Sequence, residues 1–139
     1  MPATLPATET ASILIVEDNA DAADSLARFL HAGCGYQVRV AYDGAAGVRS
    51  AAADPPDVII CDIALPRMDG FRVAQAVAAL PTRRPLLVAV TAYGGAYPEA
   101  RARDAGFDHY LLKPADPFVI EALIQAHLQR VAEAGPADE

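Results

Sequence analysis

Charged and hydroxyl side chains stand directly after several apolar runs of this chain. Glu17 and Asp18 follow the run SILIV, and Asp62 follows VIIC. Thr91 ends a fourth apolar run, and Lys113 follows HYLL. A polar group in this position is either an ordinary turn residue or a functional group fixed at the end of a buried strand. The choice depends on whether the runs belong to one sheet.

Together, these side chains would form a recognisable chemical site. Three carboxylates placed close together repel one another and raise their own pKa values. A divalent cation relieves that repulsion, and carboxylate oxygens completed by water are the ligands that Mg²⁺ prefers. The ammonium of Lys113 adds a second positive charge, so the site would attract a phosphoryl group. An aspartate among these groups can then act as a nucleophile and form an aspartyl phosphate.

The pattern of the chain alternates between strand and helix periods. Strands are predicted at 12–16, 36–41, 58–61, 85–91 and 109–112, and helices at 20–33, 43–53, 70–80, 98–106 and from 117 onward. Asp43, Asp69 and Asp116 are the expected N-caps of three helices. The last helix is expected to bury one face, made of Ile120, Leu123, Ile124, Leu128 and Val131.

Strands that are apolar throughout require cover on both faces, which predicts a parallel sheet between layers of helices. Carboxyl ends of parallel strands lie at one edge of the sheet, so the polar groups that follow them should converge. One alternative concerns Asp18, because Asp18 and Asp21 have the spacing of a capping box and Asp18 could cap the first helix. Capping is compatible with metal binding.

Length and charge exclude several classes of protein. The 139 residues fit one domain, and the net charge is −7, with no basic run longer than Arg83–Arg84. A nucleic-acid groove needs clustered cations, so direct DNA binding is not expected. The first eleven residues lack the features of a signal peptide, and no apolar stretch approaches the roughly 20 residues of a membrane span. We therefore expect a cytoplasmic protein without membrane contact.

The ends and the remaining polar residues receive simple interpretations. Residues 1–11 are predicted to be a disordered lead, 12–132 the folded domain, and 133–139 a disordered acidic tail. Cys34 and Cys61 show no metal-type spacing and are expected to be buried thiols. His31, His109 and His127 show no ligand-type spacing and are expected at the surface or the rim.

Four motifs in this order and spacing, ILIVEDN, VIICDIALPRMDG, VAVTAY and YLLKP, resemble the receiver domain of bacterial two-component response regulators. The resemblance covers about residues 12–132. It implies a doubly wound α/β fold, a flavodoxin-like three-layer sandwich with five parallel strands in the order 2-1-3-4-5 and five helices. It also implies that Asp62 accepts a phosphoryl group from a histidine kinase, a histidine phosphotransfer protein or a small phosphodonor.

The resemblance assigns roles to the other residues. A Mg²⁺ ion, or Mn²⁺, would be held by Glu17, Asp18, Asp62 and the backbone carbonyl of Ala64. Thr91 and Lys113 would bind phosphoryl oxygens, Thr91 and Tyr110 would form the switch pair, and the Lys113–Pro114 peptide would be cis. Ala64 and Tyr93 occupy the positions that tune the phosphoryl lifetime. Since Ala64 cannot orient water and Tyr93 is bulky, slow autodephosphorylation is expected.

The implied function is that of a single-domain response regulator, which catalyses only its own phosphorylation and dephosphorylation. It would switch a downstream protein through a face made of strand 4, helix 4, strand 5 and helix 5. One alternative is a receiver cut from a hybrid histidine kinase that acts in a phosphorelay; the start at Met1 and the short tail favour the stand-alone form. A haloacid-dehalogenase-like phosphohydrolase is less favoured, because that class places a second acid where this chain has Ala64. A non-phosphorylated interaction module would require broken site residues, and none is broken.

Overall fold

The computed structural model describes residues 11–134, in which strands and helices alternate along the chain. The strands are β1 (Ser12–Val16), β2 (Gln37–Ala41), β3 (Val58–Asp62), β4 (Leu86–Thr91) and β5 (His109–Leu112). The α-helices are α2 (Ala20–Arg28), α3 (Gly44–Ala53), α4 (Gly70–Ala78), α5 (Glu99–Ala105) and α6 (Pro117–Ala134), and a π-helical turn, η1 (Phe29–Gly33), continues α2. Residues 1–10 and 135–139, which hold most of the predicted lead and tail, lie outside the described residues.

All neighbouring strands pair in parallel, in the order β2-β1-β3-β4-β5. The predicted doubly wound sheet is therefore confirmed. From β1 the chain passes to one edge of the sheet, and from β3 it proceeds to the other, which places a topological switch point between β1 and β3. The register pairs Val16 with Cys61, Asp62 with Val90 and Thr91 with Leu112. The carboxyl ends of these strands consequently share one edge.

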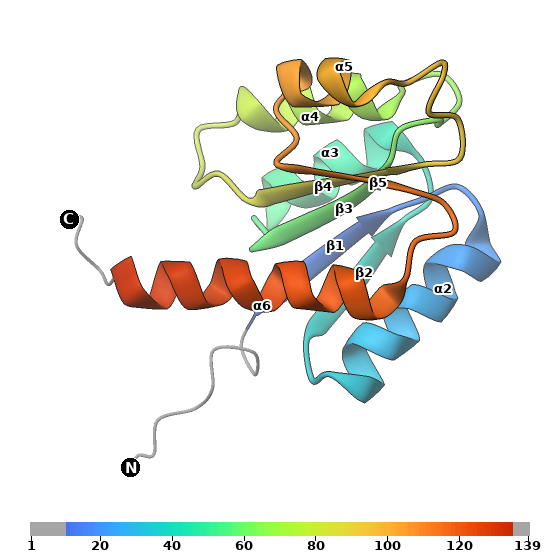
Figure 1. Cartoon of the computed structure of the whole chain (residues 1–139). Coiled ribbons are helices and arrows are strands. Elements are labelled where there is room, and N and C mark those ends of the chain that lie inside the picture. The colour runs from blue at the N-terminus through green and yellow to red at the C-terminus, as the bar shows by residue number, and fades with distance from the viewer. Residues whose placement is uncertain (1–10, 135–139) are drawn as a thin grey trace, which may run out of the picture.

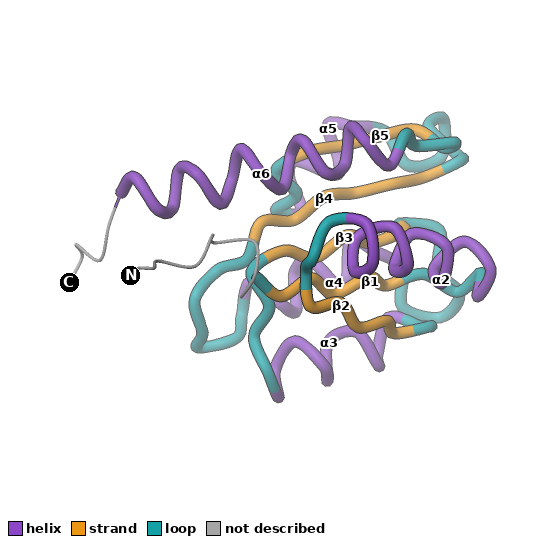
Figure 2. The backbone as a smooth tube through the Cα atoms, turned by 90° about the horizontal axis from the view of Figure 1, so that it is seen from below, coloured by secondary structure: helices purple, strands orange, loops and turns teal. Residues whose placement is uncertain are grey.

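Helices cover both faces of the sheet (Figure 1). On one face, α3, α4 and α5 pack onto a core that includes Leu14, Ile59 and Phe71. On the other, α2 and α6 pack onto a core that includes Ile13, Ile60 and Ile124. The view in Figure 2 looks onto this second face. Successive residues of one strand thus enter opposite cores, as continuous apolar strands require.

Short polar side chains begin the helices. The carboxylates of Asp43 and Asp69 accept backbone N–H groups in the first turns of α3 and α4, and that of Asp116 accepts the N–H of Phe118. These predicted caps are confirmed. The cap of α2 is Asn19, whose side chain accepts the N–H of Ala22. Asp18 therefore does not cap this helix.

Several boundaries and burials differ from the sequence prediction. The first helix is α-helical only to Arg28 and closes with η1, whose wider turn absorbs extra residues without breaking the helix. Ala11, assigned to the disordered lead, is buried, and its carbonyl accepts the N–H of Gln37. Cys34, expected to be buried, is only half-buried.

The end of α6 also departs from the prediction. The helix continues to Ala134, through the first two residues assigned to the tail. Val131, expected on the buried face, is 47% exposed. Figure 1 shows the reason: the C-terminal turns of α6 extend past the edge of the sheet, where no strand remains to pack against.

Tyr36 connects the start of β2 to α6. It is completely buried, and its hydroxyl donates to Glu121 Oε2 at 2.9 Å and accepts from Gln125 Nε2 at 3.1 Å. Burial raises the pKa of the Tyr36 phenol far above its ordinary value, so the hydroxyl remains a donor. These hydrogen bonds join α6 to the start of β2, two elements that lie far apart in the sequence.

None of the helices within residues 11–134 combines the length and apolar character that a membrane crossing would require.

Candidate functional site

Three acidic side chains meet at the carboxyl edge of the sheet. One ligand oxygen from each of Glu17, Asp18 and Asp62 lies within 4.8 Å of the other two. Glu17 and Asp18 follow β1, and Asp62 ends β3, so the switch point between these adjacent strands brings them together. Glu17 and Asp62 are buried, while Asp18 is exposed.

Lys113 reaches this cluster from the end of β5. Its Nζ lies 2.6 Å from Glu17 Oε1 and 3.1 Å from Asp62 Oδ2. Burial raises the pKa of the Glu17 carboxyl, although hydrogen bonds from Lys113 and from the N–H of Asn19 oppose the shift. Burial also lowers the pKa of Lys113, but the Glu17 hydrogen bond and the Asp62 charge together outweigh it and raise that pKa above its ordinary value. The ammonium is thus held in its charged form between two carboxylates.

The carboxylate of Asp62 is oriented on both sides. Oδ2 accepts from Lys113, and Oδ1 accepts the backbone N–H of Ala64 at 3.1 Å. Asp62 is the last residue of the central strand β3 and is only 5% exposed. Such a buried, oriented carboxylate is held in one geometry, as a nucleophile requires.

Asp18 is the least constrained member of the cluster. Its carboxylate makes no hydrogen bond or ion pair with any part of the chain that the structure describes, because Asn19 takes over the cap of α2. The set offers three carboxylates with hard oxygen donors, one of them exposed to water and unengaged. This donor chemistry fits Mg²⁺, which prefers a few carboxylates and keeps several waters.

Thr91 and Tyr110 lie on the next two strands of the sheet, Thr91 at the end of β4 and Tyr110 in β5. Thr91 is completely buried at the end of β4, and its Oγ1 accepts the N–H of Tyr93 at 3.0 Å. Tyr110 is half-buried in β5, and its hydroxyl donates to the carbonyl of Tyr97 at 2.6 Å. The Lys113–Pro114 peptide is cis, as the resemblance implied.

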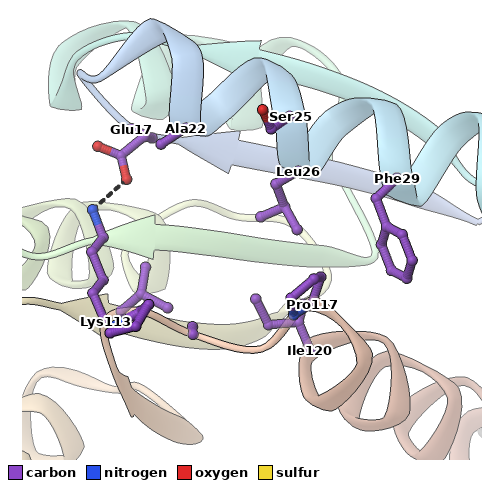
Figure 3. Close-up of a pocket in the computed structure, with 11 residues that line it drawn as sticks. Glu17, Ala22, Ser25, Leu26, Phe29, Lys113, Pro117 and Ile120 are labelled. Atoms are coloured by element: carbon purple, nitrogen blue, oxygen red, sulfur yellow. Dashed lines mark hydrogen bonds and ion pairs between the residues drawn. The ribbon is translucent and has the colours of Figure 1, made fainter.

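An apolar pocket of about 330 Å³ opens beside the acidic cluster. Figure 3 shows Leu26 of α2 and Phe29 of η1 facing Ile120 of α6 across it, with the Glu17–Lys113 ion pair at one end. Sequence reasoning missed this pocket. The apolar periodicity of its lining residues predicts only that a helix face is buried, and it does not show whether that face is tightly packed or borders a cavity.

The other candidate residues lie apart from the cluster. His31 is exposed, and His109 and His127 are half-buried, consistent with the surface or rim expected. Backbone donors add contacts that the sequence did not indicate: like the Ala64 N–H at Asp62, the backbone N–H of Asn19 donates to Glu17 Oε2 at 3.1 Å. A backbone donor has no residue-type signal, so only the fold could reveal it.

Comparisons with known proteins agree with this geometry. Residues 13–125 match the family model of the response regulator receiver domain. Among curated relatives, the response regulator MprA of Mycobacterium avium is 33% identical over 91% of this chain and 54% of its own length. The transcriptional regulatory protein PrrA of Mycobacterium tuberculosis is 36% identical over 85% of this chain and 50% of its own. The chain thus spans about half the length of these relatives.

Solved structures give the same result. A CheY-like response regulator receiver domain protein from Methanospirillum hungatei superposes with a TM-score of 0.81 at 27% identity, covering 91% of this chain and 99% of its own. The chemotaxis response regulator CheY4 of Vibrio cholerae superposes with a TM-score of 0.76 at 25% identity, covering 85% and 98%. With the sheet order, the acidic cluster and the family match in agreement, the chain belongs to the response regulator receiver domain family.

Proposed function

We propose that Asp62 accepts a phosphoryl group and that its phosphorylation switches the binding of a partner protein. The observation that carries this proposal is the setting of Asp62, a buried carboxylate at the end of the central strand with Lys113 Nζ 3.1 Å away. The acids Glu17 and Asp18 lie beside it. The donor would be a histidine kinase or a histidine phosphotransfer protein, or a small acyl phosphate.

The reaction is a transfer between two nucleophiles. An oxygen of Asp62 forms a bond to phosphorus while the bond from phosphorus to the donor breaks, and that electron pair leaves with the imidazole nitrogen or with the carboxylate of an acyl phosphate. Glu17, Asp18, Asp62 and the Ala64 carbonyl would hold Mg²⁺, which would supply positive charge against the phosphoryl oxygens. Lys113 supplies positive charge to a second phosphoryl oxygen, and Thr91 Oγ donates to a third.

The switch would couple Thr91 to Tyr110. If Thr91 turns toward the phosphoryl group, it leaves the Tyr93 N–H, and the loop between β4 and α5 is released. In that loop, the carbonyl of Tyr97 accepts a hydrogen bond from the Tyr110 hydroxyl. The Tyr97 ring packs against Phe71 of α4 with 5.7 Å between centroids. Movement at the acceptor would therefore reach β5, α5 and α4 together.

The proposed partner surface is the face of β4, α5, β5 and α6. Five large apolar side chains of these elements and of the β4–α5 loop are exposed: Phe118 at 71%, Tyr93 at 61%, Leu112 at 57%, Val131 at 47% and Val119 at 43%. Exposed large apolar side chains are common where a protein binds a partner. Output would come from a downstream protein, or from passing the phosphoryl group onward in a relay.

We also propose a long phosphoryl lifetime. Ala64 offers no side chain that could orient a hydrolytic water, and Tyr93, whose backbone N–H donates to Thr91 Oγ1, would shield the phosphoryl group with its large ring. Replacing Ala64 by Asn should increase the rate of dephosphorylation, measured by the loss of phosphoprotein after the donor is removed. A half-life of seconds for the unsubstituted protein in Mg²⁺ would contradict the proposal.

The acceptor is tested with acetyl phosphate and Mg²⁺, followed by intact-mass spectrometry. The protein should gain one phosphoryl group, and the Asp62→Asn variant should gain none. Asp69→Asn is the matched control, because asparagine also caps a helix and Asp69 lies outside the acidic cluster. Equal labelling of the Asp62→Asn variant and the unsubstituted protein would refute the assignment.

A further inference from the structure

Gly70, the first residue of α4, rests directly on the backbone that carries Asp62. A Cβ at position 70 would lie 2.6 Å from the Cα of Ile63 and 2.8 Å from the carbonyl oxygen of Asp62. Real Cβ atoms essentially never approach other atoms within 3.0 Å. Because both neighbours are backbone atoms, they cannot rotate away. Only glycine allows α4 to begin this close to β3.

One peptide group joins Gly70 to the acceptor carboxylate. The carbonyl of Ile63 accepts the N–H of Gly70 at 2.8 Å. The N–H on the other side of that same peptide belongs to Ala64 and donates to Asp62 Oδ1 at 3.1 Å. A peptide group is planar, so fixing the direction of its carbonyl also fixes the direction of its N–H. The Ile63 carbonyl also accepts the N–H of Leu65 at 2.8 Å, so the hydrogen bonds from Gly70 and Leu65 together set where the Ala64 N–H points.

The surrounding backbone leaves this peptide little freedom to adjust. The N–H of Ile63 donates to the carbonyl of Val90 in β4 at 3.0 Å. The far end of the loop is held as well, because a Cβ on Gly44 would lie 2.5 Å from the carbonyl oxygen of Met68. If Gly70 is displaced, the peptide between Ile63 and Ala64 must therefore move with it.

We propose that Gly70 is a positioning residue for the acceptor, acting on the Asp62 carboxylate through the peptide between Ile63 and Ala64. This inference rests on the proposed role of Asp62. The Ala64 carbonyl, the proposed metal ligand, belongs to the next peptide and moves with the first. Gly70 thus controls two oxygen ligands without touching either the metal or the phosphoryl group.

The first test compares Gly70→Ala with Val77→Ala. Val77 lies seven residues further along the same helix, is buried in the core and outside the acidic cluster, and its truncation costs stability. We expect Gly70→Ala to weaken the affinity of the unphosphorylated protein for Mg²⁺ by roughly tenfold, as the loss of an orienting contact around a metal ligand does. Val77→Ala should keep the original affinity, although urea unfolding shows both variants destabilised. Equal Mg²⁺ affinity in the two variants would overturn the inference.

A second test needs no change at Gly70 and applies even if the alanine variant does not fold. The backbone amide resonances of the unsubstituted protein are followed by NMR during titration with MgCl₂ and compared with those of Asp62→Ala. The Gly70 amide should shift in both experiments, because it lies across the peptide from the carboxylate, while the Val77 amide stays in place. A Gly70 amide that responds to neither change would overturn the inference.

The two proposals can fail separately. If acetyl phosphate leaves the unsubstituted protein unlabelled, the proposed function fails. The Mg²⁺ affinities and the Gly70 amide shifts still judge the positioning role, because both are measured without phosphorylation.

Discussion

Replacing Asp18 with asparagine should stabilise the metal-free protein and remove its response to Mg²⁺. Asp18 faces two carboxylates and one ammonium, a net of one like charge. At the 4.8 Å that bounds the cluster, one like charge costs about 0.9 kcal/mol in bulk water and about 3.5 kcal/mol at an effective dielectric constant of 20. Asp18 is exposed, so the lower end applies, and its carboxylate has no hydrogen bond to lose within residues 11–134.

The expected gain in EDTA is therefore about 1 kcal/mol, or about 3–5 °C in Tm for a domain of this size. In Mg²⁺ at ten times its Kd, the unsubstituted protein gains about 1.4 kcal/mol by mass action. Asp18→Asn lacks one of the three carboxylates and should lose most of the stabilisation that Mg²⁺ binding provides. The order of stability of the two proteins would then invert between EDTA and saturating Mg²⁺.

Thermal unfolding followed by circular dichroism, in EDTA and in a Mg²⁺ series, measures both effects. Asp21→Asn is the control, since Asp21 is an exposed acid in the first turn of the same helix but outside the cluster. It should lose a little stability in EDTA, because an acid there favours the helix dipole, and keep the full response to Mg²⁺. A destabilised Asp18→Asn in EDTA, or an undiminished Mg²⁺ response, would refute the reasoning.

Three further outcomes are expected. Burial lowers the pKa of His127, so folding disfavours its protonation, and the stability of the protein falls as pH drops below 6.5 toward the lowered pKa. In urea unfolding, His127→Gln should lose less stability than the unsubstituted protein between pH 7 and 5 and should have the same stability at pH 8. Tyr36→Phe leaves Glu121 without its phenol donor and should cost about 1–2 kcal/mol in the same assay. Tyr110→Phe removes the hydroxyl that Tyr97 accepts, and faster amide hydrogen exchange in residues 93–105 should report a loosened loop.

The sequence predicted the sheet and the convergence of the site because both follow from strong patterns. Continuous apolar strands require a doubly covered parallel sheet, and that sheet brings the residues after β1, β3 and β5 to one edge. The identity of the cap was harder, because asparagine and aspartate are equally good N-caps and Asn19 and Asp18 are adjacent. The choice matters chemically, since it leaves Asp18 unengaged.

Other features had no signal in residue type. The π-helical turn η1 keeps the apolar spacing of an α-helix to within a residue, so periodicity cannot detect it. The exposure of Val131 depends on where the sheet ends, and the hydrogen bonds from the N–H groups of Asn19, Ala64 and Gly70 depend on backbone alone. These were available only from the assembled fold.

The burial of Tyr36 beneath α6 has a consequence for the order of folding during synthesis. Tyr36 and its partner Glu121 are separated by 85 residues, and Ile120, Ile124 and Leu128 complete the core on that face of the sheet. While α6 is still inside the ribosomal exit tunnel, this face of the sheet lacks its cover and is exposed to aggregation or to chaperones. Closure of the domain must wait for its last helix.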